Sequence, residues 1–293
     1  MASAKLVSGA NFPLDAKLAP DTRLSRPRLE LSGPKLANAF RALAAGAEET
    51  GGVERYVDAL KLKSRLFAEM LGAGRARTVD LGQFRALCAC MSTARRRVGP
   101  YVEPEAFGPV RERVATLLEG AANEADVRIE AFCAAFPDDR AHRWVRDLAA
   151  EVLHQVEPER YPLMNRWVWD HRTNTGALRE IWHAADVDRI TIEVASRYET
   201  YVVLREEIAQ FLAANGVYRD VLFFIDLLLA QVYAAYIHEQ GGSYLRADFA
   251  NAEEPMMHIR RLLGLDAVTE DGRLRVKAAD GTAIVAEDAR LPH

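Results

Sequence analysis

The residues best suited to chemistry gather between positions 160 and 183. This stretch, RYPLMNRWVWDHRTNTGALREIWH, holds three of the four tryptophans together with His171 and His183. Trp144 and His154 lie shortly before it. Aromatic rings beside imidazole and guanidinium groups are typical of a reaction centre, a ligand pocket, a contact surface or the aromatic middle of a core. The direction of each side chain decides between these possibilities.

Two Glu-x-x-His motifs, Glu151/His154 and Glu180/His183, are the sharpest candidates for metal ligation. In di-metal helical bundles such a motif supplies two inward-facing ligands. At about 100° per residue, Glu151 falls about 90° and His154 about 150° from the apolar stripe of its helix. Glu180 and His183 also point away from their stripe. We therefore expect no cofactor and no metal in the core, and keep these four residues as candidates only for a surface or subunit contact.

The aromatic stretch divides into two faces if Pro162 starts a short helix that runs through Trp169. Leu163, Met164, Trp167 and Val168 then share an apolar face, and Trp167 and Trp182 are predicted to lie in the core. The residues off that face combine polar and aromatic groups, as contact surfaces do. The predicted binding residues of this edge are Arg166, Trp169, Asp170, His171, Arg172 and Asn174.

A second candidate binding loop follows the most apolar segment, in the sequence HEQGGSYLR. Two adjacent glycines after a helix are usually its stop, because glycine adopts the left-handed conformation without a Cβ clash. The polar neighbours leave a ligand loop open. Its candidate residues are His238, Gly241, Gly242, Tyr244 and Arg246. The chain has no nucleophile elbow, Walker loop or dinucleotide-binding fingerprint.

Charge and hydropathy argue against nucleic acid and membrane partners. The net charge is −4, so no bulk positive field attracts phosphate backbones or anionic lipid. The arginine-rich segment 75–97 is followed by the acidic segment 98–139, which internal pairing explains as well as a phosphate-binding surface does. The apolar run 221–237 is shorter than the roughly 20 residues of a membrane span and contains Asp226. We expect a buried core helix there, with Asp226 paired to an arginine or a tyrosine hydroxyl.

Cysteine usage favours a reducing compartment. Three cysteines are too few for a disulfide framework. The segment 1–14 lacks an apolar core of signal-peptide length. A cytoplasmic location is expected, and the abundance of arginine and alanine suggests a bacterial-type protein.

Hydrophobic periodicity predicts an all-α fold, a multi-helix bundle or an orthogonal helical array. Residues 1–34, with four prolines, are predicted to form an extended N-terminal arm that docks on another surface. A helical domain is expected over 35–266, possibly as two subdomains, 35–136 and 138–266. Residues 267–293 are predicted to form a small β-hairpin around Asp280-Gly281. Helices are expected over 34–49, 53–71, 81–98, 104–120, 123–136, 140–156, 162–169, 176–185, 198–216, 217–239 and 253–265, with a lone strand over 188–196.

These observations predict a protein that acts by binding. We expect a soluble helical accessory, adaptor or assembly subunit that binds a protein partner or forms a homo-oligomer, with no membrane contact. One alternative is an enzyme with a small-molecule or metal site between helices, near Glu151, His154, Glu180 and His183. A second alternative, a helical protein that binds nucleic acid, is less favoured because the positive charge is dispersed.

Overall fold

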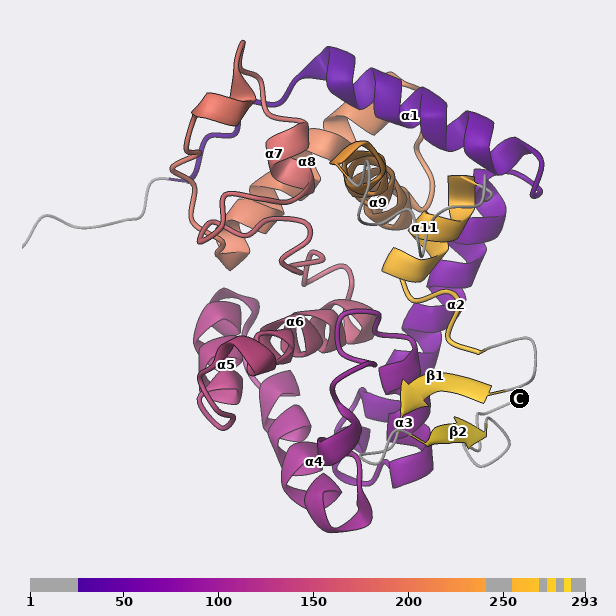
Figure 1. The fold of residues 1–293 in the computed structure, drawn as a ribbon, viewed down its shortest axis with the longest axis vertical. Helices are drawn as coiled ribbons and strands as arrows, with labels where there is room; N and C mark the ends of the chain where they lie inside the picture. Colours follow the sequence, from indigo (N-terminus) through magenta and orange to yellow (C-terminus); the bar gives the residue numbers. More distant parts are fainter. Residues whose placement is uncertain (1–25, 241–254, 269–272, 278–281, 286–293) are drawn as a thin grey trace, which may run out of the picture.

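The computed structural model describes residues 26–240, 255–268, 273–277 and 282–285, and it is an array of helices with one small hairpin (Figure 1). The helices are α1 (Gly33–Glu48), α2 (Val53–Leu71), α3 (Leu81–Ala89), α4 (Pro104–Leu118), α5 (Ala125–Cys133), α6 (Trp144–Val156), α7 (Ala177–Glu180), α8 (Tyr198–Ala214), α9 (Val221–Gln240) and α11 (Pro255–Leu262). Short 3-10 turns η1 to η5 cover Arg75–Arg77, Gly99–Tyr101, Ala122–Glu124, Arg140–His142 and Val187–Arg189. The all-α prediction is confirmed.

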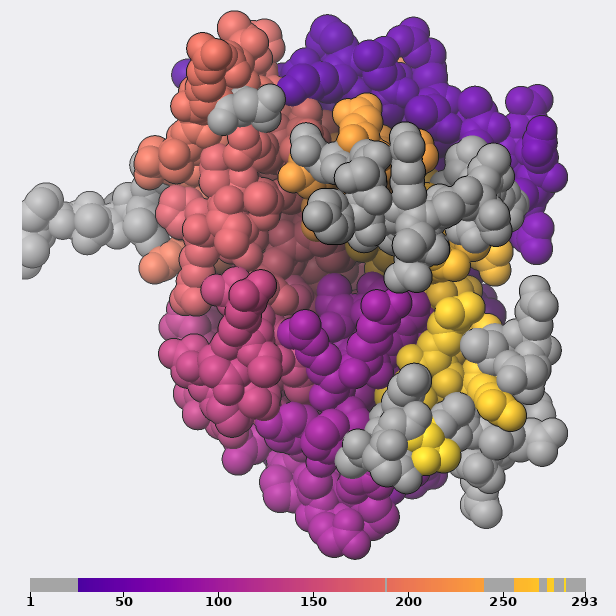
Figure 2. Space-filling view, in the orientation of Figure 1, coloured from indigo at the N-terminus to yellow at the C-terminus, as the bar shows by residue number. Residues whose placement is uncertain are grey.

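The helices pack in two groups around two central helices. In the lower group of Figure 1, α6 contacts α2, α4 and α5. In the upper group, α9 contacts α1, α2, α7, α8 and α11. The long helix α2 belongs to both groups and joins them along one side. Figure 2 shows the two groups as an upper and a lower mass that meet across the middle of the molecule.

Local sequence signals place the helix ends. Ser32 caps α1, its side chain accepting a hydrogen bond from the Lys35 amide, and Pro34 sits in the first turn, where it costs no hydrogen bond. Asp80 and Gln83 form a reciprocal capping box at the start of α3. Gly264, after α11, has φ +68°, and a Cβ there would lie 1.8 Å from the Cys90 carbonyl oxygen. Only glycine lets these two turns approach so closely.

Helix α9 is a core helix that resembles a membrane span in composition. Over Val221–Glu239 its mean hydropathy is 1.7, and it alone among the described helices is long and apolar enough to cross a membrane. It nevertheless packs against five helices, and Ile225 to Ala230 are buried without interruption. Asp226 lies inside this buried run and is ion-paired. The expected core helix is confirmed over residues 225–230, whereas most of the rest of α9 is only partly buried.

Four local predictions are wrong. The helix expected over 81–98 ends at Ala89, and only one helical turn, α7, forms within 176–185. No helix forms over 162–169, because the Asp147 carboxylate accepts the Arg166 amide proton and the Trp167 carbonyl accepts from Ala177 instead. No strand forms over 188–196. Its backbone is bonded by side chains instead: Asn174 bonds the Ile190 carbonyl and the Ile192 amide, and the Trp169 indole bonds the Val194 carbonyl.

At the two ends of the helical array, only the residues that the structure describes can be compared with the predicted arm and hairpin. Before α1 the chain is extended, and Leu31 forms an antiparallel bridge with Trp182. The rest of the predicted arm, residues 1–25, lies outside the described residues. Strands β1 (Arg273–Lys277) and β2 (Ala283–Val285) pair antiparallel and β1 packs on α3, so the C-terminal hairpin is confirmed. The predicted turn at Asp280-Gly281 lies outside the described residues.

Trp169 contradicts the facing argument made from the sequence. Without the expected short helix, its side chain turns inward, and its exposed fraction is 0%. The indole Nε1 donates to the Val194 carbonyl oxygen at 2.7 Å. Trp167 is buried as expected, whereas Trp182 is only partly buried against the core. Trp169 therefore belongs to the core.

We predict that Trp169→Ala lowers the free energy of unfolding by about 3–5 kcal/mol, as truncation of other buried tryptophans does. Tyr218→Ala is the matched control, because the exposed fraction of Tyr218 is 76%. That change is expected to stay within about 0.5 kcal/mol of wild type. Chemical denaturation measures both values, and equal small losses would show that Trp169 is not a core residue.

Candidate functional site

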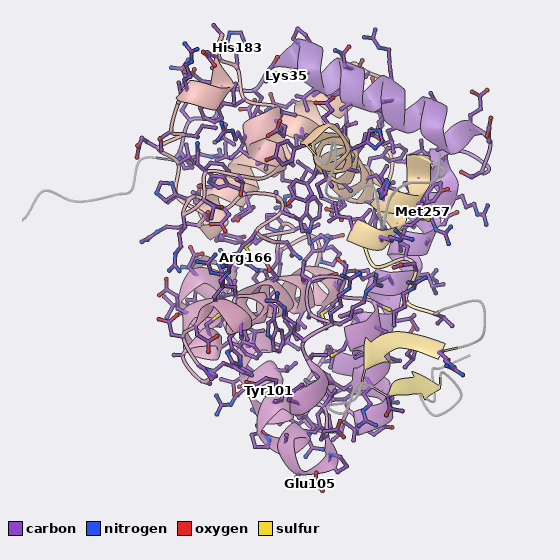
Figure 3. The ribbon with its side chains drawn as sticks, viewed as in Figure 1. Lys35, Tyr101, Glu105, Arg166, His183 and Met257 are labelled. Carbon is purple, nitrogen blue, oxygen red and sulfur yellow. The ribbon has the colours of Figure 1, made fainter. Side chains whose placement is uncertain are left out.

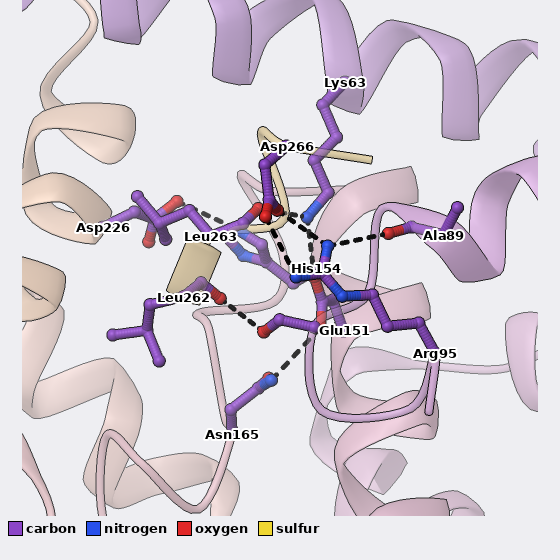
Figure 4. Close-up of polar contacts among 11 residues, drawn as sticks. Lys63, Ala89, Arg95, Glu151, His154, Asn165, Asp226, Leu262, Leu263 and Asp266 are labelled. Carbon is purple, nitrogen blue, oxygen red and sulfur yellow. Dashed lines mark hydrogen bonds and ion pairs between the residues drawn. The ribbon is translucent and has the colours of Figure 1, made fainter. Parts of the chain in front are cut away.

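One face of α6 carries three ionisable side chains, Asp147, Glu151 and His154, that are all buried. Their spacing of four and then three residues places them within about 60° of one another on the helix. The opposite face of α6 is apolar and packs into the lower helical group. We call these three residues the polar face of α6. Each of them bonds a different part of the molecule, as Figure 4 shows for Glu151 and His154.

Glu151 forms a buried ion pair with Lys63 of α2. The Lys63 Nζ lies 2.7 Å from the Glu151 Oε1, and the two side chains are 5% and 4% exposed. Lys63 also donates to the Leu263 carbonyl oxygen at 2.8 Å, and Asn165 donates to the Glu151 Oε2 at 3.3 Å. Buried charges that lose their partner are costly, because neither water nor another dipole replaces the lost interaction.

His154 pairs with Asp226 of α9. The imidazole Nε2 lies 2.9 Å from the Asp226 Oδ2, and Nδ1 lies 2.9 Å from the Tyr161 carbonyl oxygen. Burial by itself lowers the pKa of His154, but the Asp226 charge and the two hydrogen bonds outweigh it and raise the pKa above its usual value. Asp226 is thus buried and paired as predicted, but its partner is a histidine instead of an arginine or a tyrosine hydroxyl.

The two Glu-x-x-His motifs do not share a site. Glu151 and His154 face inward, so the prediction that they point away from the core is wrong; α6 is buried on both faces. Figure 3 shows His183 at the top of the molecule beside Lys35, far from α6. His183 itself is exposed. Within the part of the chain that the structure describes, no three His, Cys, Asp or Glu residues are grouped as metal ligands.

Asp147 organises the loop that follows α6. Its Oδ1 accepts the Arg166 amide proton at 2.8 Å, and its Oδ2 accepts from the Arg166 Nε at 3.0 Å and Nη2 at 2.7 Å. Charge-assisted contacts of this kind fix orientation as well as adding stability. Figure 3 places Arg166 between α6 and the loops of the upper group. Asp147 therefore sets the path of the chain from Arg166 to Arg172.

That loop forms one side of a cleft of about 760 Å³ between the two helical groups. The remaining lining comes from α5, the turn after it, the start of α6 and the segment just before α8. Half of the lining residues are aspartate, glutamate or arginine. These charged residues are Asp126, Glu130, Asp138, Asp139, Arg143, Arg146, Arg166, Asp170, Arg172 and Arg197.

Both signs of charge are available in the cleft. Arg143, Arg172 and Arg197 are exposed, and their guanidinium groups bond no other described residue. The carboxylates of Glu130 and Asp138 are also exposed and bond no other described residue. By contrast, Asp147 engages Arg166, and the Met164 and Ser196 carbonyl oxygens accept from Arg146. The five unpaired groups are the ones that an incoming partner can bind.

Two further groups in the cleft are held by the fold. The Asp126 carboxylate accepts the Tyr198 amide proton at 3.0 Å, and burial raises the pKa of Asp126 despite the lowering effect of that bond and of Arg146 and Arg197. Burial raises the pKa of the Cys133 thiol to about 11, so at neutral pH it stays protonated and is a poor nucleophile. These residues shape the cleft, and we assign neither of them a covalent reaction.

A hydroxyl, an imidazole and a carboxylate are also linked at the rim. The Tyr101 hydroxyl lies 2.7 Å from the His142 Nε2, and the His142 Nδ1 lies 2.8 Å from the Asp139 Oδ1. Catalytic triads use such a chain. Here the Tyr101 ring packs against Phe136 and Trp144, and Asp139 also caps the backbone amides of Ala141 and His142. The chain therefore serves to fix the turn before α6.

The structure brings part of the predicted binding edge to the cleft. Arg166, Asp170, His171 and Arg172 line it, whereas Trp169 is buried. Asn174 instead holds the segment at Ile190 and Ile192. Glu180 lies in α7. His238 is exposed at the end of α9, and the loop residues Gly241, Gly242, Tyr244 and Arg246 lie outside the described residues.

Sequence reasoning missed the residues that complete the site. Lys63 and Asp147 were not expected to be buried, and Arg143, Arg146 and Arg197 were not expected to join the 166–172 segment. A signal for Asp147 was present: Asp147, Glu151 and His154 share one helical face. Their partners could not be found this way, because Lys63 lies 88 positions from Glu151 and Asp226 lies 72 positions from His154.

We predict that Glu151→Leu lowers the free energy of unfolding by about 3–5 kcal/mol, because it leaves the Lys63 charge buried without a counter-ion. The double variant Lys63→Met/Glu151→Leu removes both charges and should recover most of that loss. Glu112→Leu is the control, since Glu112 is half-exposed in its ion pair with Arg77 and should cost less than about 1 kcal/mol. Urea denaturation of the three variants measures these values, and a double variant as unstable as Glu151→Leu would contradict the role given to charge.

The His154–Asp226 pair should stabilise the fold most at low pH. A histidine whose pKa is raised by folding contributes its full stability below the unfolded value of about 6.5 and loses it as pH rises through the higher folded pKa. The stability difference between wild type and His154→Gln should therefore shrink as pH rises from about 6.5 to the folded pKa, by at most about 1.4 kcal/mol per pH unit. Denaturation curves measured between pH 5 and pH 9, at intervals of about one pH unit, test this prediction. A constant or growing difference would mean that folding does not raise the pKa of His154.

Comparison of the chain with protein families, with curated proteins and with solved structures finds no match. The fold and the cleft therefore carry no function over from a relative. What the molecule does has to be argued from the charges and shape of the cleft itself.

Proposed function

We propose that this chain is a binding protein whose cleft takes an extended, charged polypeptide segment of a protein partner. The observation that carries the proposal is the presence of unpaired guanidinium groups and unpaired carboxylates in the same cleft. Arg143, Arg172 and Arg197 provide the first, and Glu130 and Asp138 the second. An occupant that carries both signs of charge leaves neither set facing a like charge.

The composition of the cleft disfavours the rival ligand classes. Pockets for small organic molecules are lined predominantly by hydrophobic and aromatic side chains, whereas half of the residues that line this cleft are charged. A polyphosphate or a nucleic acid backbone would bring only negative charge towards Glu130 and Asp138. A polypeptide strand with acidic and basic side chains presents both signs, because successive side chains of a strand point to opposite faces.

Arginine suits this role better than lysine would. Its planar guanidinium group binds carboxylates through two parallel hydrogen bonds, so three arginines select the register of an acidic partner as well as its charge. The binding energy is expected to be modest, because exposed ion pairs are partly screened by salt. An accessory or adaptor protein that releases its partner fits that strength.

We further propose that the protein works in the reducing environment of the cytoplasm. Cys88, Cys90 and Cys133 are all free thiols. Burial raises the pKa of Cys88 and Cys90, which keeps both thiols protonated. Structural thiols of this kind persist where glutathione and thioredoxin keep cysteines reduced.

The proposal predicts selective binding of a mixed-charge peptide. The probe is a fluorescein-labelled peptide of about twelve residues that alternates glutamate and lysine, long enough to span the cleft when extended. Its comparators replace every lysine or every glutamate by glutamine. Fluorescence anisotropy should show that the mixed peptide binds the full chain more tightly than either comparator, and that added salt weakens the binding.

Charge reversal in the cleft tests where the probe binds. Arg172→Glu/Arg197→Glu should weaken binding of the mixed peptide about tenfold or more, equivalent to about 1.4 kcal/mol. Arg65→Glu is the matched control, since Arg65 is an exposed arginine of α2 outside the cleft. Equal binding of all three peptides, or equal binding by the cleft and control variants, would overturn the proposed function.

A further inference from the structure

A second hollow, a groove of about 440 Å³, lies between α4 and α5. These two helices pack against each other in the lower group of Figure 1. Pro109, Arg113 and Leu117 line the groove from α4, and Arg128, Ala131 and Phe132 line it from α5. The buried side chains of Leu117 and Phe132 give it an apolar floor. The groove shares no lining residue with the cleft, so it is a separate hollow.

Helix α5 is the ridge that separates the groove from the cleft. Arg128 and Phe132 line the groove, whereas Glu130 and Cys133 line the cleft. At about 100° per residue, these two pairs point about 150° apart on the helix. Val127 lies on the crest between them, and its exposed fraction is 66%. A segment that leaves the cleft across α5 therefore passes Val127 and reaches the groove.

Arg113 is the charged group of the groove that the fold leaves available. Its guanidinium carbon lies 5.7 Å from the centre of the Phe136 ring, and its nitrogens bond no other described residue. By contrast, Glu112 pairs with Arg77, and Arg128 donates to backbone carbonyl oxygens between 117 and 121. One unmatched guanidinium group beside an apolar floor suits an apolar side chain next to a carboxylate.

The width of α5 sets the spacing that a partner needs in order to bind both hollows. A helix with its side chains is about 10–12 Å across. An extended strand advances about 3.3 Å per residue, so about three or four residues cross the ridge. The second contact becomes intramolecular once the first has formed, which raises the affinity for a segment long enough to make both.

We propose that the polypeptide partner of the cleft continues across α5 and places an apolar side chain and an adjacent carboxylate in the α4–α5 groove, with the carboxylate on Arg113. The inference rests on the proposed function, because the occupant of the groove is a continuation of the occupant of the cleft. It defines the pattern that the partner carries: a mixed-charge stretch, about three or four residues over α5, and then an apolar–acidic pair.

Longer peptides test this pattern. The fluorescein-labelled mixed-charge peptide is compared with two extended forms, which carry a spacer of about four glycine and serine residues and then a leucine–glutamate pair, at one end or at the other. Fluorescence anisotropy with the full chain should show that one extended form binds about tenfold more tightly than the short peptide, equivalent to about 1.4 kcal/mol. The same extension ending in serine and glutamine should give no gain.

Two variants test whether the gain comes from the groove. The gain is the ratio of the affinities of the extended and short peptides for the same protein. Arg113→Gln removes the cation, and Ala131→Glu places a repelling carboxylate at an exposed position of the groove, so each should abolish the gain. Arg111→Gln is the matched control and should keep it. Arg111 lies over the Phe107 ring on the same helix and lines neither hollow.

The short peptide separates this inference from the proposed function. If the short peptide binds but neither extension adds affinity, the proposed function stands and the inference is overturned. A gain that either groove variant leaves intact would also overturn the inference, because the extension would then bind elsewhere. If only an extended peptide binds, and both groove variants abolish its binding, the groove is a binding site and the proposed function of the cleft is wrong. No binding by any of the peptides overturns both.

Discussion

The polar face of α6 is the constraint on which the rest of the structure depends. Asp147, Glu151 and His154 are charged or ionisable groups inside a core, and each is stable there only with its partner in place. Those partners come from the 163–166 loop, from α2 and from α9. Apolar contacts would hold the two helical groups together in many arrangements, whereas these bonds require one. The polar face therefore fixes how the upper group sits on α6.

The cleft follows from that arrangement. Asp147 takes both the backbone amide and the guanidinium group of Arg166, so the chain leaves α6 as an ordered loop instead of the helix its sequence favours. This loop turns Trp169 into the core and brings Arg172 out beside the start of α6. The buried charges are saturated by one another, and the unpaired charges are left at the rim. The ionisable residues thus form two sets. The buried set is paired within the protein and holds the fold, and the exposed set at the cleft is free to bind a partner in the proposed function.

Sequence patterns predicted the elements whose stability is local. Ser32 and Asp80 mark the starts of α1 and α3 correctly, and the apolar run at 221–237 marks α9, because capping and hydrophobic periodicity act within a few residues. Prediction failed where a side chain distant in the sequence forms hydrogen bonds with the backbone. Asp147 prevents a helix at 162–169 in this way, and Asn174 with Trp169 prevents a strand at 188–196. The inward direction of Glu151 and His154 was missed for a related reason, since α6 is buried on both faces and a single apolar stripe does not define its inside.

Amide hydrogen exchange of Asp147→Asn tests most directly whether the polar face of α6 shapes the cleft. Removing this charge weakens the contacts to Arg166 but leaves the Glu151 and His154 pairs in place. The account predicts faster exchange at the Arg166 amide and through residues 166–172, with exchange in α9 unchanged. Exchange in the 166–172 loop that matches wild type would contradict it, because the loop would then hold its shape without the Asp147 charge.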